Sequence, residues 1–315
     1  MKRTPTMVSQ VEDYLGVRRQ MGFALEVAGK QLLAFARFAD RIGHRGAVTF
    51  DLAVQWAQAP PCRARLTSAR RIEVLRPFLK YRSQFDAGTA SVPGGYFGPT
   101  HRRLVPHVYT QGEIAELLRA TDELLPRDGL RPLTYRTLFG LLVVTGFRIS
   151  EALHLQSADV DLARGILTVR QTKFRKSRLV PLHPTTVSEL KRYVEIRKRK
   201  LMGRHSDAFF VSDRGGSLPS RTVHSTFEKL RARLRWVARG SYASPRIHDI
   251  RHTFICRSLL KGYQQNQHPD SIIDTLSTYV GHAKVTDTYW YVSATPELMA
   301  IAAQQFARFV EGGRR

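Results

Sequence analysis

Four short segments of the sequence concentrate side chains that can bind phosphate, carry protons or attack an electrophile. They are TGFRISEALHL, TVRQTKFRKSRLVPL, HDIRHTF and VGHAKVTDTYWYV, which begin at residues 145, 168, 248 and 280. The groups of interest are two arginines, a lysine at a predicted hairpin turn, two histidines and a pair of tyrosines: Arg148, Lys173, His248, Arg251, His282, Tyr289 and Tyr291. His248 and Arg251 are three residues apart, so a helix directs both side chains to the same side.

This set of side chains matches the needs of phosphodiester cleavage. Attack on phosphorus places extra negative charge on the non-bridging oxygens, and guanidinium groups bind such oxygens through paired, charge-assisted hydrogen bonds. Donors that are held in place usually provide the largest share of transition-state stabilisation. A tyrosine phenol, with an ordinary pKa of about 10, attacks when a base or a positive field assists it, and a lysine or histidine protonates the leaving oxygen. Because the arginines neutralise the charge, this chemistry requires no metal.

Each of these residues, taken singly, also has an ordinary structural explanation. Arg148 has Glu151 nearby as an ion-pair partner, and a lysine at a hairpin turn usually faces solvent. A histidine close to an arginine is often a satisfied core residue. The occurrence of all of them in one chain favours a catalytic site.

In this order and at these spacings, the four segments resemble the signatures of the tyrosine recombinase (phage integrase) family. The resemblance is strong over roughly residues 105–310 and rests on position and basic helical character for the first domain. It implies two phosphate-binding arginines, a hairpin general acid, two supporting histidines and one nucleophile, which are respectively Arg148 and Arg251, Lys173, His248 and His282, and Tyr291. Members of the family cut DNA through a 3′-phosphotyrosyl bond and release a 5′-hydroxyl that attacks the partner strand, so neither ATP nor another cofactor is implied.

Two departures from the family pattern require a choice. The stretch between Arg251 and His282, which includes KGYQQNQHPDSI, is longer than usual, and a polar loop accounts for it. The family pattern places the nucleophile nine residues after the histidine of the Gly-His pair, which selects Tyr291 and leaves Tyr289 as a packing residue. Arg175 and Lys176 remain the alternatives to Lys173.

The elements that must position these groups form two domains. Apolar residues at three- and four-residue spacing predict helices over 11–43, with a break near Gly22, and over 49–58 and 67–85. We expect an all-helical N-terminal DNA-binding domain at 1–90, a glycine- and proline-rich linker at 91–106 and the catalytic domain at 107–315. By resemblance the first is a core-binding (SAM-like) domain. The second is predicted to be mainly α with a small antiparallel β-sheet (α+β), with a capped helix from Thr110, a buried helix near 133–148, strands at 166–171 and 177–182, and helices from 222 onward.

The net charge identifies the expected partner. The formal charge is +24, and residues 1–105 already hold 17 Lys or Arg against 7 Asp or Glu, so the excess is not a basic tail. A chain that is basic throughout favours a polyanion, most often double-stranded DNA. We expect phosphate contacts from the basic helix at 67–85 and from the hairpin, through Arg70, Arg71, Arg76, Lys80, Arg82, Arg175 and Lys176.

Other features exclude several classes of protein. Cys62 and Cys256 lack the paired spacing of a zinc site or a disulfide framework. The longest apolar stretch, LFGLLVV at 138–144, is too short to span a bilayer, and no signal peptide or membrane anchor stands out. We therefore expect a cytoplasmic protein without a membrane partner.

Alternative functions remain open from the sequence alone. A metal-dependent transposase or nuclease needs converging carboxylates, a non-catalytic DNA-binding accessory protein keeps the fold without the reaction, and a type IB topoisomerase shares the chemistry. The target DNA and the need for accessory proteins are not encoded in recognisable motifs. The segment HAKVTDTYWYVSATPELM resembles the corresponding segment of integrases of mobile elements. The segment TPELMAIAAQQFARFV predicts an amphipathic terminal helix. By resemblance it docks on a neighbouring subunit, so that a homotetramer acts on paired sites; related recombinases are further candidate partners.

Overall fold

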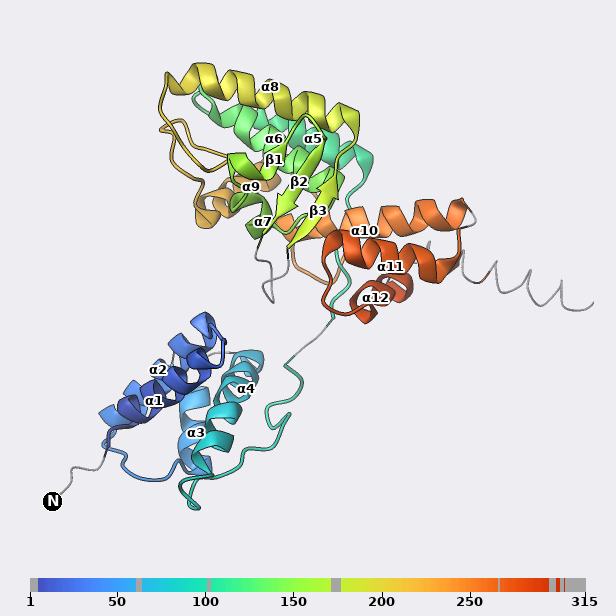
Figure 1. Cartoon of the computed structure of the whole chain (residues 1–315). Coiled ribbons are helices and arrows are strands. Elements are labelled where there is room, and N and C mark those ends of the chain that lie inside the picture. The colour runs from blue at the N-terminus through green and yellow to red at the C-terminus, as the bar shows by residue number, and fades with distance from the viewer. Residues whose placement is uncertain are drawn as a thin grey trace, which may run out of the picture. The chain divides into compact units, whose positions relative to one another are not determined.

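The chain forms two compact units, Met1–Arg103 and Leu104–Arg315. The computed structural model shown in Figure 1 describes residues 5–60, 64–100, 103–170, 177–265, 267–294, 299–300 and 303. Within the segment 91–106, Val92 is buried in the core of the first unit, whereas the Val105 carbonyl accepts a hydrogen bond from the Ser241 backbone of the second. The two ends of this segment therefore pack with different units.

The described part of the first unit is all-helical, as predicted. Its four helices are α1 (Met7–Gln20), α2 (Glu26–Arg41), α3 (Phe50–Gln58) and α4 (Arg65–Arg82). The break falls at Gly22, which has a φ of 90° that glycine adopts without strain. Thr49 caps α3 by accepting a hydrogen bond from the Leu52 amide. Phe35 packs edge-to-face against Trp56 and Phe78 and so joins three of the helices.

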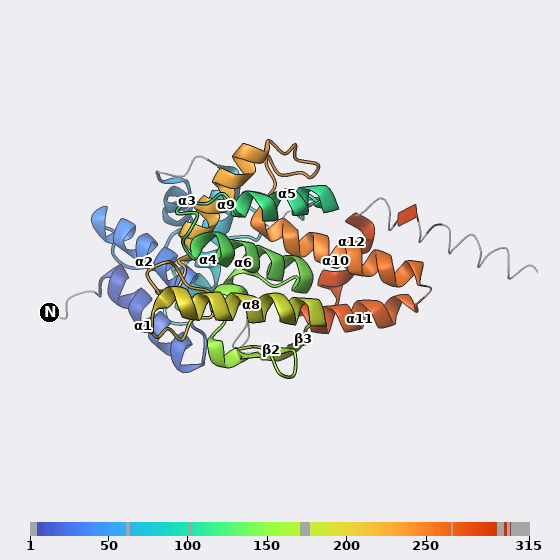
Figure 2. The same cartoon turned by 90° about the horizontal axis from the view of Figure 1, so that it is seen from above.

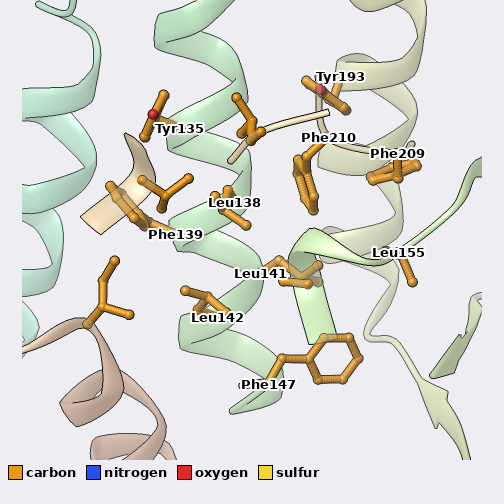
Figure 3. Packing of buried hydrophobic residues seen from close by; sticks show 14 of the residues in the cluster. Tyr135, Leu138, Phe139, Leu141, Leu142, Phe147, Leu155, Tyr193, Phe209 and Phe210 are labelled. Carbon is orange, nitrogen blue, oxygen red and sulfur yellow. The ribbon is translucent and has the colours of Figure 1, made fainter. Parts of the chain in front are cut away.

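The second unit is built around the helix α6 (Arg131–Thr145). Its neighbours are α5 (Gln111–Thr121), α8 (Pro184–Leu201) and α10 (Ile247–Gln264). Figure 3 shows Tyr135 and Phe139 on one side of α6 and the aromatic pair Phe209 and Phe210 on its other side, and all four belong to one core cluster. The predicted capping box of Thr110 and Glu113 is present at the start of α5.

A three-stranded antiparallel sheet covers part of this core. Its order is β1 (Val160–Asp161), β2 (Ile166–Val169) and β3 (Arg178–Pro181), with Val169 opposite Arg178. The two predicted strands are confirmed in shorter form, whereas β1 and the long helix α8 were not predicted. The fold is mainly α with one small antiparallel sheet, as the sequence indicated.

The remaining helices carry most of the groups of interest. A short helix, α7 (Ile149–Leu153), follows α6, and α9 (Ser220–Leu234) precedes α10. Figure 2 shows α11 (Pro269–Val280) and α12 (Thr286–Ala294) beside α10 at one end of the second unit, and these three helices contact one another. Most of the predicted terminal helix at 295–310 lies outside the described residues. No helix in the part of the chain that the structure describes is long and apolar enough to cross a membrane.

Candidate active site

Arg148 lies at the junction between α6 and α7, where the chain reverses. Gly146 ends α6 in the left-handed conformation, and Arg148 is the N-cap of α7. The Arg148 amide donates to the carboxylate of Glu151 at 3.0 Å, and its guanidinium donates to the same carboxylate at 2.8 Å. A second guanidinium nitrogen donates to the Gly281 carbonyl at 3.1 Å. The side chain keeps 29% of its surface exposed, so it is held in place and still reaches solvent.

Arg251 is the buried counterpart on α10. Its side chain is 2% exposed and donates to the carbonyls of Gly146 and Val280, each at 2.8 Å. Burial and then the positive charge of Arg148 lower the pKa of Arg251 to about 9. The guanidinium is still charged at neutral pH. Two arginines that are 103 residues apart in the sequence are therefore anchored to adjacent residues at the end of α11.

The two predicted histidines flank this pair. His248 precedes Arg251 by one turn of α10 and its side chain reaches the surface. His282 follows Gly281, and its Nδ1 lies 2.7 Å from the Thr288 hydroxyl. The protein around each ring, and then the charge of Arg251, lowers the pKa of both histidines to about 4. Both rings are therefore neutral at pH 7 and able to accept a proton or a hydrogen bond.

Tyr291 lies on α12 with its ring beside that of His282. It is 4% exposed and packs with Ile255 of α10 and Ile273 of α11. Its ring is nearly parallel to that of His282, with centroids 6.3 Å apart. Burial raises the pKa of the Tyr291 phenol above its ordinary value, and the charge of Arg251 acts in the opposite direction. The phenol is therefore protonated at neutral pH and needs a base before it can attack.

Tyr289 occupies a different environment, although it is only two residues away. Its side chain is 44% exposed, and its hydroxyl donates to the carboxylate of Asp270 at 2.5 Å. That hydrogen bond raises the pKa of Tyr289 because it stabilises the protonated phenol beside a negative charge. The geometry distinguishes the two tyrosines: Tyr291 faces the histidines, and Tyr289 faces an acid.

His252 is a further member of the cluster that the sequence reasoning missed. Its Nδ1 lies 2.6 Å from the Tyr291 hydroxyl, and its ring is perpendicular to that of His248 at 4.7 Å. Burial, followed by the nearby His248 and Arg246, lowers the pKa of His252 to about 3, so the ring is neutral. The available signal was the spacing, because residues four apart share one face of a helix.

Other predicted residues are not part of this cluster. Lys173, Arg175 and Lys176 lie outside the described residues. In the first unit, Arg70, Arg76 and Lys80 are exposed on α4, and Arg82 is half-buried. Arg71 instead donates to the carbonyls of Trp56 and Ala59 at the end of α3, at 3.0 and 2.7 Å, which gives this arginine a structural contact.

Within the described residues, no group of three or more histidine, cysteine, aspartate or glutamate side chains is arranged to hold a metal ion. Two acidic residues near the cluster instead pair with arginines. Glu151 pairs with Arg148, and Asp249 pairs with Arg246 at 2.6 Å. The described part of the site is therefore a collection of guanidiniums, neutral imidazoles and a phenol.

Comparison with known proteins finds sequences similar to this chain. The Phage integrase family matches residues 107–297. A relative in Sinorhizobium fredii (strain NBRC 101917 / NGR234), described as "Putative integrase/recombinase y4rB", is 37% identical over 309 residues, which cover 96% of this chain and 98% of the relative. "Tyrosine recombinase XerC" of Chlamydia caviae is 27% identical over 240 residues and covers 75% of this chain and 70% of the relative.

Solved structures share the fold. The Tn1549 transposon integrase in complex with transposon right end DNA aligns with a TM-score of 0.66 at 16% identity, over 97% of this chain and all of the other. The XerH site-specific recombinase bound to difH in a post-cleavage complex aligns with a TM-score of 0.65 at 17% identity, over 95% of this chain and 85% of the other. At such low identities these likenesses concern the fold.

Proposed function

The chain belongs to the phage integrase family, and from the geometry of its site we propose that it is a tyrosine recombinase that cuts and rejoins double-stranded DNA through Tyr291. One observation carries the choice of nucleophile: the Tyr291 hydroxyl lies 2.6 Å from a neutral imidazole, that of His252, on the same helix as Arg251. Tyr289 has an acidic partner instead. The solved relatives described as complexes with DNA support the choice of substrate.

The first step is attack of the Tyr291 oxygen on a DNA phosphorus. The Tyr–O–P bond forms, the bond from phosphorus to the 5′-oxygen breaks, and the phenol proton passes to His252 or to solvent. Arg148 and Arg251 donate to the non-bridging oxygens as their negative charge grows. Both guanidiniums are already fixed by carbonyls of neighbouring helices, so little reorganisation accompanies the step.

The leaving 5′-oxygen requires a proton. Lys173 is the proposed donor, with Arg175 and Lys176 as alternatives, and His248 and His282 support the phosphate and the leaving group. The phosphotyrosyl bond retains the energy of the broken linkage. A 5′-hydroxyl of a partner strand then attacks it and releases Tyr291, so the reaction needs neither ATP nor a metal ion.

Exchange of strands needs two duplexes, and we propose that four subunits act on paired recombination sites, either as a homotetramer or together with related recombinases. Exposed cations of α4, including Arg70, Arg76 and Lys80, contact phosphates. The similarity to the integrase/recombinase of Sinorhizobium fredii supports a role in integration, excision or transposition of a mobile element.

A cleavage assay in the absence of divalent cations tests this function. A binding site is first selected from a pool of random-sequence duplexes, and a nicked duplex of that sequence then serves as a suicide substrate. With EDTA present, we expect the protein to form a DNA adduct that survives denaturing electrophoresis. Cleavage that requires Mg²⁺ and leaves no adduct identifies a metal-dependent nuclease, and binding without cleavage identifies an accessory protein.

A further inference from the structure

The C-terminal end of α11 presents three consecutive carbonyls, and each accepts a hydrogen bond from a different arginine. Arg178 donates to Tyr279 at 2.9 Å, Arg251 donates to Val280 at 2.8 Å and Arg148 donates to Gly281 at 3.1 Å. The last carbonyls of a helix lack partners within the helix and carry partial negative charge, so they attract cations. His282 follows directly, and its backbone is held by these three side chains together with the hydrogen bond from its own amide to the Ser277 carbonyl.

All three guanidinium nitrogens of Arg178 are engaged by the protein. Its guanidinium forms a fork on Glu151, with nitrogen–oxygen distances of 3.1 and 2.9 Å, and its third nitrogen binds the Tyr279 carbonyl. The plane lies over the ring of Phe147, and the side chain is 12% exposed. Arg148 has more of its surface exposed, at 29%.

Glu151 faces a surplus of positive charge. The described charged groups around its carboxylate are Arg148 of α7, Arg178 of β3 and Arg251 of α10, the last at 4.0 Å. One negative charge thus meets three positive ones. The fork with Arg178 neutralises the carboxylate, which leaves the charges of Arg148 and Arg251 to act on a substrate phosphate.

We propose that Arg178 is a positioning residue of the site: it neutralises Glu151 and fixes the end of α11, so that Arg148 and His282 are presented to the phosphate. This inference rests on the proposed function and deepens it. Arg178 itself does not touch the substrate. Arg178 is the first residue of β3 and follows the segment 171–176 by two positions. It therefore connects the sheet to the helices that carry the arginines and to His282.

The close approach of Gly281 to Arg178 is consistent with this role. Gly281 has a φ of 70°, and a Cβ atom at this position would lie 2.8 Å from an Arg178 nitrogen and 3.0 Å from Cζ. The guanidinium and the helix end therefore pack without room for a side chain. Burial acts to raise the pKa of Glu151, but the hydrogen bonds and charge of Arg178, with help from Arg148, hold that pKa below its ordinary value.

The test compares Arg178→Met with a matched control, Arg239→Met. Arg239 also forms a fork on an N3 glutamate, Glu113, whose exposed fraction of 9% equals that of Glu151. We expect Arg178→Met to slow single-turnover cleavage of a nicked duplex on the order of 10- to 100-fold at matched DNA occupancy, less than the loss of a direct donor. Arg239→Met should cleave at nearly the unsubstituted rate.

The pH profile separates positioning from a loss of folding. Without Arg178, fewer cations surround the buried Glu151 carboxylate, so its pKa rises. As the pH falls from 8 to 5.5, Glu151 is then protonated and no longer competes with the substrate phosphate for Arg148 and Arg251. The ratio of the Arg178→Met rate to the unsubstituted rate should therefore increase toward low pH. Adding Glu151→Gln to Arg178→Met should restore part of the rate at pH 8 and abolish the pH dependence of that ratio.

Equal rates of Arg178→Met and the unsubstituted protein at every pH would overturn the inference, as would a loss that neither low pH nor Glu151→Gln relieves. If Arg178→Met does not fold, Arg178→Lys replaces it. The lysine keeps one charge but cannot form the fork, so a smaller loss with the same dependence on pH is expected, and a normal rate contradicts the role. Absence of adduct formation by the unsubstituted protein would instead refute the proposed function.

Discussion

Arg148 and Arg251 are both anchored to the C-terminal end of α11, but the rest of each side chain is held by different contacts. Arg251 is almost fully buried and held by two carbonyls, whereas Arg148 is held by Glu151 and one carbonyl and keeps part of its surface exposed. Main-chain carbonyls fix both guanidiniums without cancelling their charge. This arrangement suits a site that must stabilise an anion that develops during the reaction.

Replacing either arginine by alanine should remove this stabilisation. A single donor aimed at a developing oxyanion is worth on the order of 10²- to 10³-fold in rate, and we expect at least that loss of cleavage for Arg148→Ala and Arg251→Ala. Single-turnover cleavage at matched DNA occupancy measures it. Arg170→Ala serves as the control, because it removes an arginine that follows β2 and pairs with Asp159. Near-normal cleavage by either variant would rule out its assigned role.

The histidines predict how stability depends on pH. In the folded chain the pKa is lowered to about 4 for His248 and His282 and to about 3 for His252, below the ordinary value of about 6.5. The unfolded chain therefore binds more protons between these values, so the free energy of unfolding should fall as the pH decreases from about 6.5 toward 4. Thermal unfolding at pH 7.0, 6.0 and 5.0 measures this decrease.

A substitution identifies the histidine contribution. His252→Gln removes one of the depressed groups, so its unfolding temperature should depend less on pH over this range than that of the unsubstituted chain. His205→Gln is the control, because that side chain is 88% exposed. Equal pH dependence in all three proteins would show that burial does not hold His252 neutral.

The junctions between helices position the residues of the site, and at Gly146 the junction of α6 and α7 packs tightly against α10. A Cβ atom at Gly146 would overlap the ring of Phe254 on α10, and the φ of 62° is one that other residues adopt at a cost. The turn from α6 to α7 and the contact with α10 both require a residue without a side chain at position 146. The Gly146 carbonyl also binds Arg251, so the same residue links packing to the site.

Gly146→Ala should therefore destabilise the second unit by about 1–3 kcal/mol through strain and overpacking. Gly140 is the matched control, because it lies inside the same helix with no atom within 4 Å of an added Cβ. Gly140→Ala should raise stability by about 0.5–1 kcal/mol, since alanine favours the helix. Chemical denaturation of residues 104–315 measures both, and an unchanged Gly146→Ala protein would contradict the close approach.

Sequence patterns predicted the helices around the site because apolar spacing and caps are local signals. The helices of the first unit, the Thr110 cap and the two hairpin strands were all identified in this way. α8 and the two-residue β1 were missed, since a strongly basic helix and a very short strand give weak periodic signals. Spacing places His252 on the same face of α10 as His248, but its contact is with a residue 39 positions away, and the contact of Arg178 with Glu151 spans 27 positions. Local patterns do not reveal such contacts.

Both units are basic, and this bears on how the whole chain binds DNA. We expect the two units to close around the duplex, with residues 86–109 passing beside it. Each unit then contributes phosphate contacts, and the affinity should fall steeply with salt because counterions are released on binding. The two compact units provide a natural division for an experiment.

Residues 104–315 alone should bind the selected site more weakly than the full chain, with a shallower slope of log affinity against log salt. Fluorescence anisotropy at 50–300 mM salt measures both quantities. Charge-reversing Arg70→Glu and Lys80→Glu in the full chain should act in the same direction if α4 contacts DNA. Equal affinity and slope for the fragment and the full chain would contradict closure around the duplex.

The identity of the nucleophile is the central claim, and mapping the DNA-linked residue tests it most directly. The protein is trapped on a nicked duplex, the DNA is trimmed with nuclease, and trypsin releases the peptide that spans residues 285–308, which contains both Tyr289 and Tyr291. Fragmentation in the mass spectrometer should place the nucleotide on Tyr291, and Tyr291→Phe should bind DNA without forming an adduct, whereas Tyr289→Phe should still form it. A nucleotide on Tyr289, or an adduct that persists in Tyr291→Phe, would contradict the account.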